Sequence, residues 1–185
     1  MGPSWYWMPD VFENYFKYFG KTVADFYDLK RLDPSYRIFY SKEDVLDVPA
    51  GLDALYKMFD RLEPGSSEHL KQFIQEGKYK YEIGINKLVR KPGLSLTELV
   101  HLDWFKGIFK LHVFESISTY VKKYFKNPQL IQLLEFPVLF LGAAPQNTPA
   151  LYSLMNYADL ALGTWYPMGG IHKIVEGMMS IARQE

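Results

Sequence analysis

The segment Gly163–Gly170, together with the residues that follow it, constrains the fold of this chain more than any other. It reads Gly-Thr-Trp-Tyr-Pro-Met-Gly-Gly, so two adjacent glycines follow an aromatic stretch and a proline. Beyond it, apolar residues recur at helical spacing: Ile171, Ile174, Val175, Met178, Met179 and Ile181. The pattern predicts an extended segment that bends at Gly169 and Gly170 and enters an amphipathic helix. Glycines at this helix N-terminus let another backbone or a flat ligand approach, although an ordinary strand-turn-helix connection has the same signature.

Proline, glycine and polar residues divide the rest of the chain into mostly helical segments. Apolar spacing predicts helices over residues 9–19, 51–62, 66–84, 104–125, 129–141 and 149–162, with a short helix around 97–98. Ser66 or Ser67 is the expected N-cap of the helix over 66–84, and Thr148 that of the helix over 149–162.

Extended segments are fewer. Residues 1–8 are expected to be extended, and residues 36–40 and 44–49 to pair as strands through a short loop. At 185 residues, the chain has the length of one domain or of one domain with a subdomain. We therefore expect an α+β fold, mostly helical, with a small, largely antiparallel sheet that includes the Tyr36–Val48 hairpin.

Composition and spacing argue against several classes of function. The 21 basic residues balance the 21 acidic ones, so no net field attracts nucleic acid and no such partner is expected. No cysteine is present, which excludes disulfides and thiolate sites. No two of the four histidines stand four residues apart, so no metal site is expected. No uncharged apolar run of ~18 or more residues occurs, so no segment is expected to span a bilayer.

Common catalytic and cofactor motifs are also missing. The sequence contains no GxSxG, no GxxxxGK[ST] and no GxGxxG, so the chain by itself cannot build the usual dinucleotide-binding turn. Aromatic residues make up 17% of the chain, which suits an interface or a greasy ligand as well as a core. The dense apolar pattern over 104–125 fits a membrane-surface helix and a buried core helix equally well.

Five segments, taken in order, resemble the bacterial-type carotenoid desaturases, the phytoene dehydrogenases of the flavin amine-oxidase superfamily. These segments are Gly2–Phe12 (GPSWYWMPDVF), Tyr27–Arg37 (YDLKRLDPSYR), Leu62–Ser66 (LEPGS), Leu141–Tyr152 and Gly163–Gly170 (GTWYPMGG). Their order and spacing agree with the family across essentially the whole chain. The resemblance implies that residues 1–185 form a substrate-binding domain fragment whose flanking FAD-binding halves are absent.

The family's chemistry supplies the remaining expectations. The parent protein would bind FAD noncovalently and desaturate a long apolar polyene by hydride transfer to the flavin. The fragment alone would hold no FAD and be inactive. Gly169, Gly170 and Met168 would lie at the flavin edge. The polyene would be bound by Trp165, Tyr166, Trp5, Lys78, Phe109 and Phe114.

One departure weakens the transfer of a mechanism. Family members often carry an Asp-x-x-Arg pair on the long helix, where this chain has Gln75 and Lys78. Glutamine cannot transfer protons as a carboxylate does, so the catalytic residues remain open. Lys78 either holds a positive charge near substrate or is a solvated surface lysine.

The resemblance also implies surroundings and leaves alternatives. We expect a cytoplasmic protein, peripheral on the cytoplasmic membrane, and a dimer formed through apolar surfaces that excision exposes. The alternatives are an isomerase, a ketolase or a retinol-saturase-like enzyme of the same superfamily, and a non-catalytic lipid-binding or membrane-adaptor domain.

Overall fold

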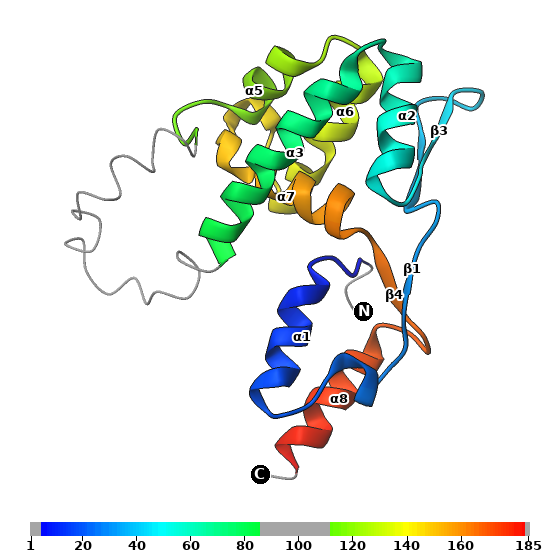
Figure 1. Ribbon diagram of the computed structural model, residues 1–185, viewed down its shortest axis with the longest axis vertical. Coiled ribbons are helices and arrows are strands. Elements are labelled where there is room, and N and C mark those ends of the chain that lie inside the picture. The colour runs from blue at the N-terminus through cyan, green and yellow to red at the C-terminus, as the bar shows by residue number, and fades with distance from the viewer. Residues whose placement is uncertain (1–4, 86–111, 184–185) are drawn as a thin grey trace, which may run out of the picture. The chain divides into compact units, whose positions relative to one another are not determined.

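The computed structural model describes residues 5–85 and 112–183 (Figure 1). Its contacts divide the chain into two compact units. Unit 1 contains the residues up to Leu55 together with those from Ala158 onward, and unit 2 is Tyr56–Tyr157. The described residues are mostly helical and carry two small antiparallel sheets, which confirms the predicted α+β class.

Unit 1 combines helices and strands from both ends of the chain. Its elements are α1 (Pro9–Tyr18), a 3-10 turn (Val23–Asp25), β1 (Leu29–Arg31), β2 (Tyr36–Phe39), β3 (Val45–Val48), β4 (Trp165–Pro167) and α8 (His172–Ala182). Helix α1 begins with Pro9 in its first turn and is followed by Gly20 at φ +68°, as the sequence predicts. Helix α2 (Leu52–Leu62) continues from this unit into the next.

The two sheets each hold two antiparallel strands. Strands β2 and β3 pair with Tyr36 opposite Val48, which confirms the predicted hairpin. Strands β1 and β4 pair with Leu29 opposite Pro167, and the sequence analysis did not foresee this long-range pairing. In Figure 1 these two strands lie side by side although one is blue and the other orange.

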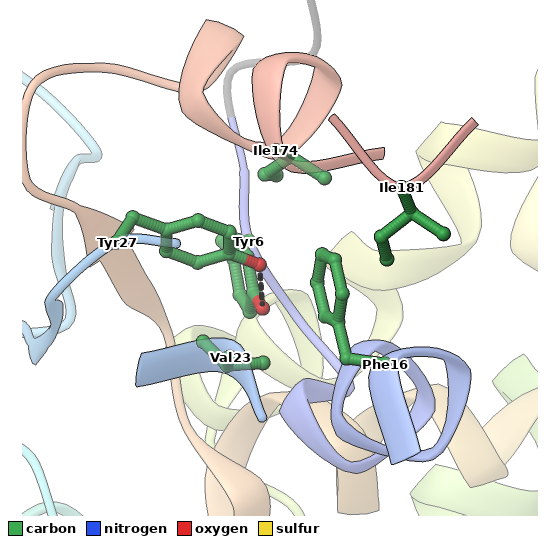
Figure 2. Close-up of a cluster of buried hydrophobic side chains, with 6 residues drawn as sticks. All are labelled: Tyr6, Phe16, Val23, Tyr27, Ile174 and Ile181. Atoms are coloured by element: carbon green, nitrogen blue, oxygen red, sulfur yellow. Dashed lines mark hydrogen bonds between the residues drawn. The ribbon is translucent and has the colours of Figure 1, made fainter. Parts of the chain in front are cut away.

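The core of unit 1 is aromatic and joins α1 to α8. Figure 2 shows its six buried side chains: Tyr6, Phe16, Val23, Tyr27, Ile174 and Ile181. The hydroxyl oxygens of Tyr6 and Tyr27 lie 3.0 Å apart, so these rings satisfy their polar ends inside the core. Helix α8 turns Ile174 and Ile181 inward and leaves Val175 and Met179 exposed, which matches the helical spacing of its apolar residues.

The secondary-structure elements in the described part of unit 2 are all helices. Its further elements are α3 (Ser66–Ile83), α5 (Ile117–Tyr124), α6 (Pro128–Glu135), a 3-10 helix (Phe136–Leu141), 3-10 turns at Pro145–Asn147 and Ala150–Ser153, and α7 (Leu154–Asn156). A π-helical turn, Tyr157–Leu162, follows α7 and crosses into unit 1. The core of unit 2 includes Leu70 and Phe73 of α3, Tyr120 of α5 and Leu130 of α6.

Two details of the predicted helices are wrong. Neither Ser66 nor Ser67 caps α3: Gly65 is the N-cap at φ +83°, and Asp60 Oδ1 accepts from the Ser67 amide at 2.9 Å. The predicted helix over 104–125 is not continuous, because α5 begins only at Ile117. The residue before it, Ser116, pairs with Pro149 in an isolated β-bridge, so its backbone is extended there.

Two other predicted helices change type along their length. The helix predicted over 129–141 is α-helical only as far as Glu135 and continues as a 3-10 helix from Phe136, because Pro137 lacks the amide hydrogen that an α-helix needs. The helix over 149–162 consists of 3-10, α and π turns in succession. Thr148 does not cap it, because its hydroxyl donates to Ala144 O at 2.9 Å.

Candidate functional site

Strand β4 carries the aromatic part of the predicted site. Trp165 is held from two sides: its backbone bridges Tyr6, and its indole Nε1 donates to Leu162 O at 2.8 Å. Alternation along the strand leaves Tyr166 41% exposed, and Met168 at the following turn is 49% exposed. The β4 segment therefore presents one braced indole and two accessible apolar side chains.

Gly163 is the glycine of this segment that another residue approaches closely. Its φ is +88°, and a Cβ atom there would lie 2.6 Å from Arg31 Nε. The Arg31 guanidinium lies 5.9 Å from the Trp165 ring centre, and its Nη2 donates to Ala161 O at 3.5 Å. A residue without a side chain fits best beside this half-buried cation.

The two glycines of the turn Gly169–Gly170 share a backbone requirement and differ in their neighbours. Both residues have positive φ, +91° and +100°, so backbone conformation alone favours glycine at both. A Cβ at Gly169 would meet Lys173 Cε at 3.1 Å, whereas at Gly170 the nearest atom is Tyr166 Oη at 3.9 Å. Gly169 is exposed and Gly170 half-buried, so both leave backbone without a side chain near the surface, and Gly169 alone has a close neighbour at its Cβ position.

Trp5 belongs to a polar and aromatic cluster that the sequence analysis missed. We call Trp5, Trp7, Tyr36, Asp159 and Thr164 the Asp159 cluster, and all of them lie in unit 1. Tyr36 Oη donates to Asp159 Oδ2 at 2.6 Å, and Thr164 Oγ1 donates to Asp159 Oδ1 at 3.3 Å. Burial raises the pKa of the Asp159 carboxyl to about 7, and the two donors only partly offset that effect. An aspartate within the apolar run Tyr157–Leu162 was the available sequence signal.

The remaining predicted site residues belong to unit 2 or lie outside the residues that the structure describes. Lys78 is exposed on α3, with its Nζ 3.9 Å from Glu82 Oε1, and Gln75 on the same helix is exposed as well. Phe114 is 85% exposed, and Phe109 lies outside the described residues, as does the short helix expected around 97–98. The structure thus groups Trp5, Trp165, Tyr166, Met168 and the glycines within unit 1.

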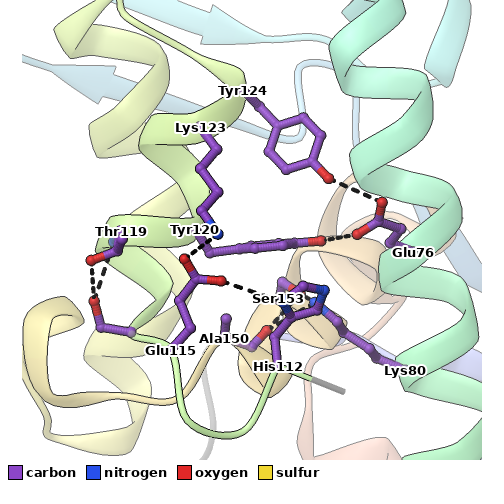
Figure 3. A network of polar contacts seen from close by, with 11 residues as sticks. Glu76, Lys80, His112, Glu115, Thr119, Tyr120, Lys123, Tyr124, Ala150 and Ser153 are labelled. Carbon is purple, nitrogen blue, oxygen red and sulfur yellow. Dashed lines mark hydrogen bonds and ion pairs between the residues drawn. The ribbon is translucent and has the colours of Figure 1, made fainter. Parts of the chain in front are cut away.

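Unit 2 contains a buried lysine that the sequence analysis did not single out. Figure 3 shows Lys80 of α3 beside Tyr120, Ala150 and Ser153. Its Nζ donates to Ala150 O at 3.2 Å and Ser153 Oγ at 3.0 Å, and lies 3.9 Å from the Tyr120 ring centre. Burial lowers the pKa of Lys80 to about 8. With these partners, the ammonium group joins α3 to the 3-10 turn at Ala150–Ser153.

A carboxylate one turn away completes this network. Glu76 accepts hydrogen bonds from Tyr120, from Tyr124 Oη at 3.0 Å and from Gln72 Nε2 at 3.1 Å. These donors, with the nearby Lys80 charge, hold the pKa of Glu76 below its usual value against the opposing effect of burial. The network is satisfied internally, which identifies it as a connection between α3 and α5.

Residues 5–85 and 112–183 contain neither a candidate metal site nor a helix able to span a membrane. No group of three or more histidine, cysteine, aspartate or glutamate side chains could hold a metal ion there. None of the helices in that part of the chain has the length and apolar character needed to cross a bilayer.

Comparison with known proteins finds homologous desaturases. All 185 residues align with the carotenoid 3,4-desaturase of Haloarcula japonica at 40% identity, covering 37% of that protein. The phytoene desaturase of Phycomyces blakesleeanus is 27% identical, and the zeta-carotene-forming phytoene desaturase of Myxococcus xanthus 28%, again over the whole chain. The chain is homologous to a portion of these desaturases.

This homology confirms the resemblance seen in the five sequence segments. The chain spans about a third of the length of these curated relatives, 37%, 32% and 36% respectively. No protein-family model matches it.

Proposed function

We propose that this chain is the substrate-binding portion of an FAD-dependent carotenoid desaturase and is inactive without the remaining portions. The observation that carries the proposal is the 40% identity to a carotenoid 3,4-desaturase over all 185 residues. The substrate class would be a long apolar polyene. The proposed polyene-binding residues are those that the resemblance implies: Trp165, Tyr166, Trp5, Lys78, Phe109 and Phe114.

The Gly169–Gly170 turn fits one edge of a flavin. Gly170 offers backbone with nothing nearer than 3.9 Å to a Cβ position, so a flat ring could approach it. Met168 and Tyr166 would flank that approach with apolar surface. When bound, FAD would accept a hydride from the polyene. The residues of this chain would orient the polyene and keep water from it.

Association with the cytoplasmic face of a membrane is part of the proposal. The 3-10 helix Phe136–Leu141 leaves three consecutive apolar residues, Leu139, Phe140 and Leu141, exposed. An apolar surface of this kind would bring the protein to the layer in which a lipid-soluble polyene is dissolved.

Self-association is a separate proposal. Val175 and Met179 are exposed one turn apart on α8, and together they form an apolar stripe that a second copy could cover. Sedimentation of the 185-residue chain over a range of concentrations tests this, and a strictly monomeric mass would reject it.

A chimera tests the proposed function directly. In it, this chain replaces the aligned portion of the Haloarcula japonica enzyme, and the product is assayed for bound flavin and for polyene conversion. We expect both to be retained. A chimera that keeps its flavin but converts the polyene by isomerisation or ketolation would support those alternatives. The 185-residue chain should purify without flavin, and a yellow preparation would contradict the fragment interpretation.

Tyr166→Ala in that chimera is the first specific prediction. Loss of the exposed ring should lower kcat/KM about tenfold, equivalent to ~1.4 kcal/mol of transition-state stabilisation, with flavin content unchanged. Tyr18→Ala is the matched control, because Tyr18 is also an exposed tyrosine but lies on α1. Equal effects of the two substitutions would remove Tyr166 from the substrate site.

A further inference from the structure

Asp159 is unusual among the acidic residues of unit 1. It lies in a π-helical turn, a local widening of the helix that is often found at functional sites, and is 2% exposed. Among the described residues it takes part in no ion pair. A carboxylate buried without a cation is costly, so a role beyond packing would account for its place in the core.

Its hydrogen bonds join a closed ring of contacts. Asp159 accepts from Tyr36 and from Thr164, and the Thr164 hydroxyl accepts from Trp7 Nε1 at 2.9 Å. Trp5 closes the ring, because its centroid lies 5.3 Å from that of Trp7 and 5.0 Å from that of Tyr36. One carboxylate therefore connects strand β2, the segment Trp5–Trp7 and the residue that precedes β4.

The proton on this carboxyl determines the direction of the hydrogen bonds. When Asp159 is ionised, Thr164 donates to Oδ1 and accepts from Trp7. If Oδ1 carries a proton, it becomes a donor, and the Thr164 oxygen must then accept from both neighbours. A charge-assisted bond is replaced by a weaker one, and the hydrogen bond from Trp7 changes with it.

Few other titratable groups act on this carboxyl. Tyr36 is itself a partner, and Tyr40 acts on Tyr36 from the same hairpin. Arg31 of β1 is the neighbouring cation; it donates to Ala161 O and lies over Trp165. The state of Asp159 is thus controlled by burial and by its two hydroxyl donors.

We propose that Asp159 is a positioning residue: when its carboxyl takes up one proton from solvent, the positions of Trp7 and of the start of β4 change. Because β4 leads to Tyr166 and Gly170, the consequence for polyene binding rests on the proposed function. The coupling itself does not, since it requires neither polyene nor flavin.

The test records the indole N–H resonances of the 185-residue chain in ¹H–¹⁵N NMR spectra from pH 5 to pH 9. The Trp7 resonance should shift with a midpoint near pH 7, and Asp159→Asn should abolish that shift. Thr164→Val should also remove it, because the hydroxyl that links Trp7 to the carboxyl is lost. Asp47→Asn is the matched control: Asp47 is an exposed carboxylate of the same unit and should leave the shift intact.

Tyr36→Phe gives a second and more conservative variant. The phenol stabilises the ionised carboxylate, so its removal should move the Trp7 midpoint to higher pH, which a purely structural role would not do. A Trp7 resonance that does not titrate in the folded wild-type chain, or a titration that survives Asp159→Asn, would overturn the proposal. Either result leaves the chimera assay unaffected, so failure of the coupling is distinguishable from failure of the proposed function.

Discussion

At the scale of single residues, the requirement for glycine differs along the segment Gly163–Gly170. A Cβ at Gly170 would make only an ordinary contact, with Tyr166 Oη at 3.9 Å, whereas Gly163 lies against the guanidinium of Arg31. That guanidinium cannot simply move away, because it is half-buried over Trp165 and donates to Ala161 O. Glycine is therefore required at position 163 for two reasons: the positive φ and the lack of room for a Cβ atom.

Gly163→Ala should consequently destabilise the chain more than Gly51→Ala. Gly51 is a matched control, since its φ of +87° nearly equals the +88° of Gly163 and nothing lies within 4 Å of its Cβ position. Each substitution should lose about 1–2 kcal/mol to backbone strain, and Gly163→Ala a further ~1–3 kcal/mol to overpacking. Urea denaturation measures both losses. Equal losses, or an extra loss that Arg31→Ala fails to relieve, would contradict the assignment.

At the scale of secondary-structure elements, one carboxylate adds polar contacts between α3 and α5. Glu76 of α3 accepts from two tyrosines of α5, Tyr120 and Tyr124 (Figure 3). Glu76→Gln removes the charge and turns one acceptor into a donor, so the hydroxyl facing it loses its partner. We expect a loss of about 1–3 kcal/mol in the free energy of unfolding.

Lys78→Ala is the control for that substitution. Lys78 lies two residues further along the same helix, and its only described ion pair is an exposed one with Glu82. It should change the free energy of unfolding by no more than ~0.5 kcal/mol. Urea denaturation of both variants under one set of conditions compares their free energies of unfolding. Similar losses would show that the carboxylate does not link the helices.

Elements with local signals were predictable from the sequence. Apolar spacing located α1, α3 and α8, and β-branched and aromatic residues located the β2–β3 hairpin. The break before α5 was missed, because the Ser116–Pro149 bridge is a tertiary contact that overrides helical spacing. Strand β1 was missed for a similar reason, since three residues have no periodicity and need β4 as a partner.

The candidate site was predictable only in part. The resemblance of the segment Gly163–Gly170 to the desaturases pointed to Trp165, Tyr166, Gly169 and Gly170, and their roles in a site stay a prediction. Asp159 and Lys80 were missed because what distinguishes them is their burial, and burial depends on which residues the fold places around them. Asp159 leaves one trace in the sequence, as a charged residue inside the apolar run Tyr157–Leu162, whereas Lys80 stands among other charged residues.

At the scale of the whole molecule, two buried groups give opposite pH dependences. The folded pKa of Asp159, about 7, exceeds that of an unfolded aspartate, so its contribution to stability is full below about pH 4 and lost by about pH 7. The folded pKa of Lys80, about 8, is below the usual lysine value, so stability rises from pH 8 toward pH 10.5. A stability minimum between pH 7 and pH 8 follows.

Urea denaturation from pH 5 to pH 9.5 should reveal this minimum. The free energy of unfolding should change by up to ~2 kcal/mol on its acidic side and on its alkaline side, which we call the acidic and the alkaline limb. Asp159→Asn should flatten the acidic limb and Lys80→Met the alkaline one, each without affecting the other. Lys78→Met, at an exposed position on the same helix, should leave both limbs in place. A profile that keeps its shape in the two variants would refute the assignment of the limbs.

The antiparallel pairing of β1 with β4 also sets an order of events during synthesis. Unit 2 is one continuous stretch of chain, so it can begin to fold as soon as Tyr157 has left the ribosome. Leu29 and Arg31 must wait for Pro167 and Trp165, which are made much later. Until then, the apolar surface of α1 has no α8 to cover it, and nascent chains stalled before Trp165 should be the ones that recruit chaperones.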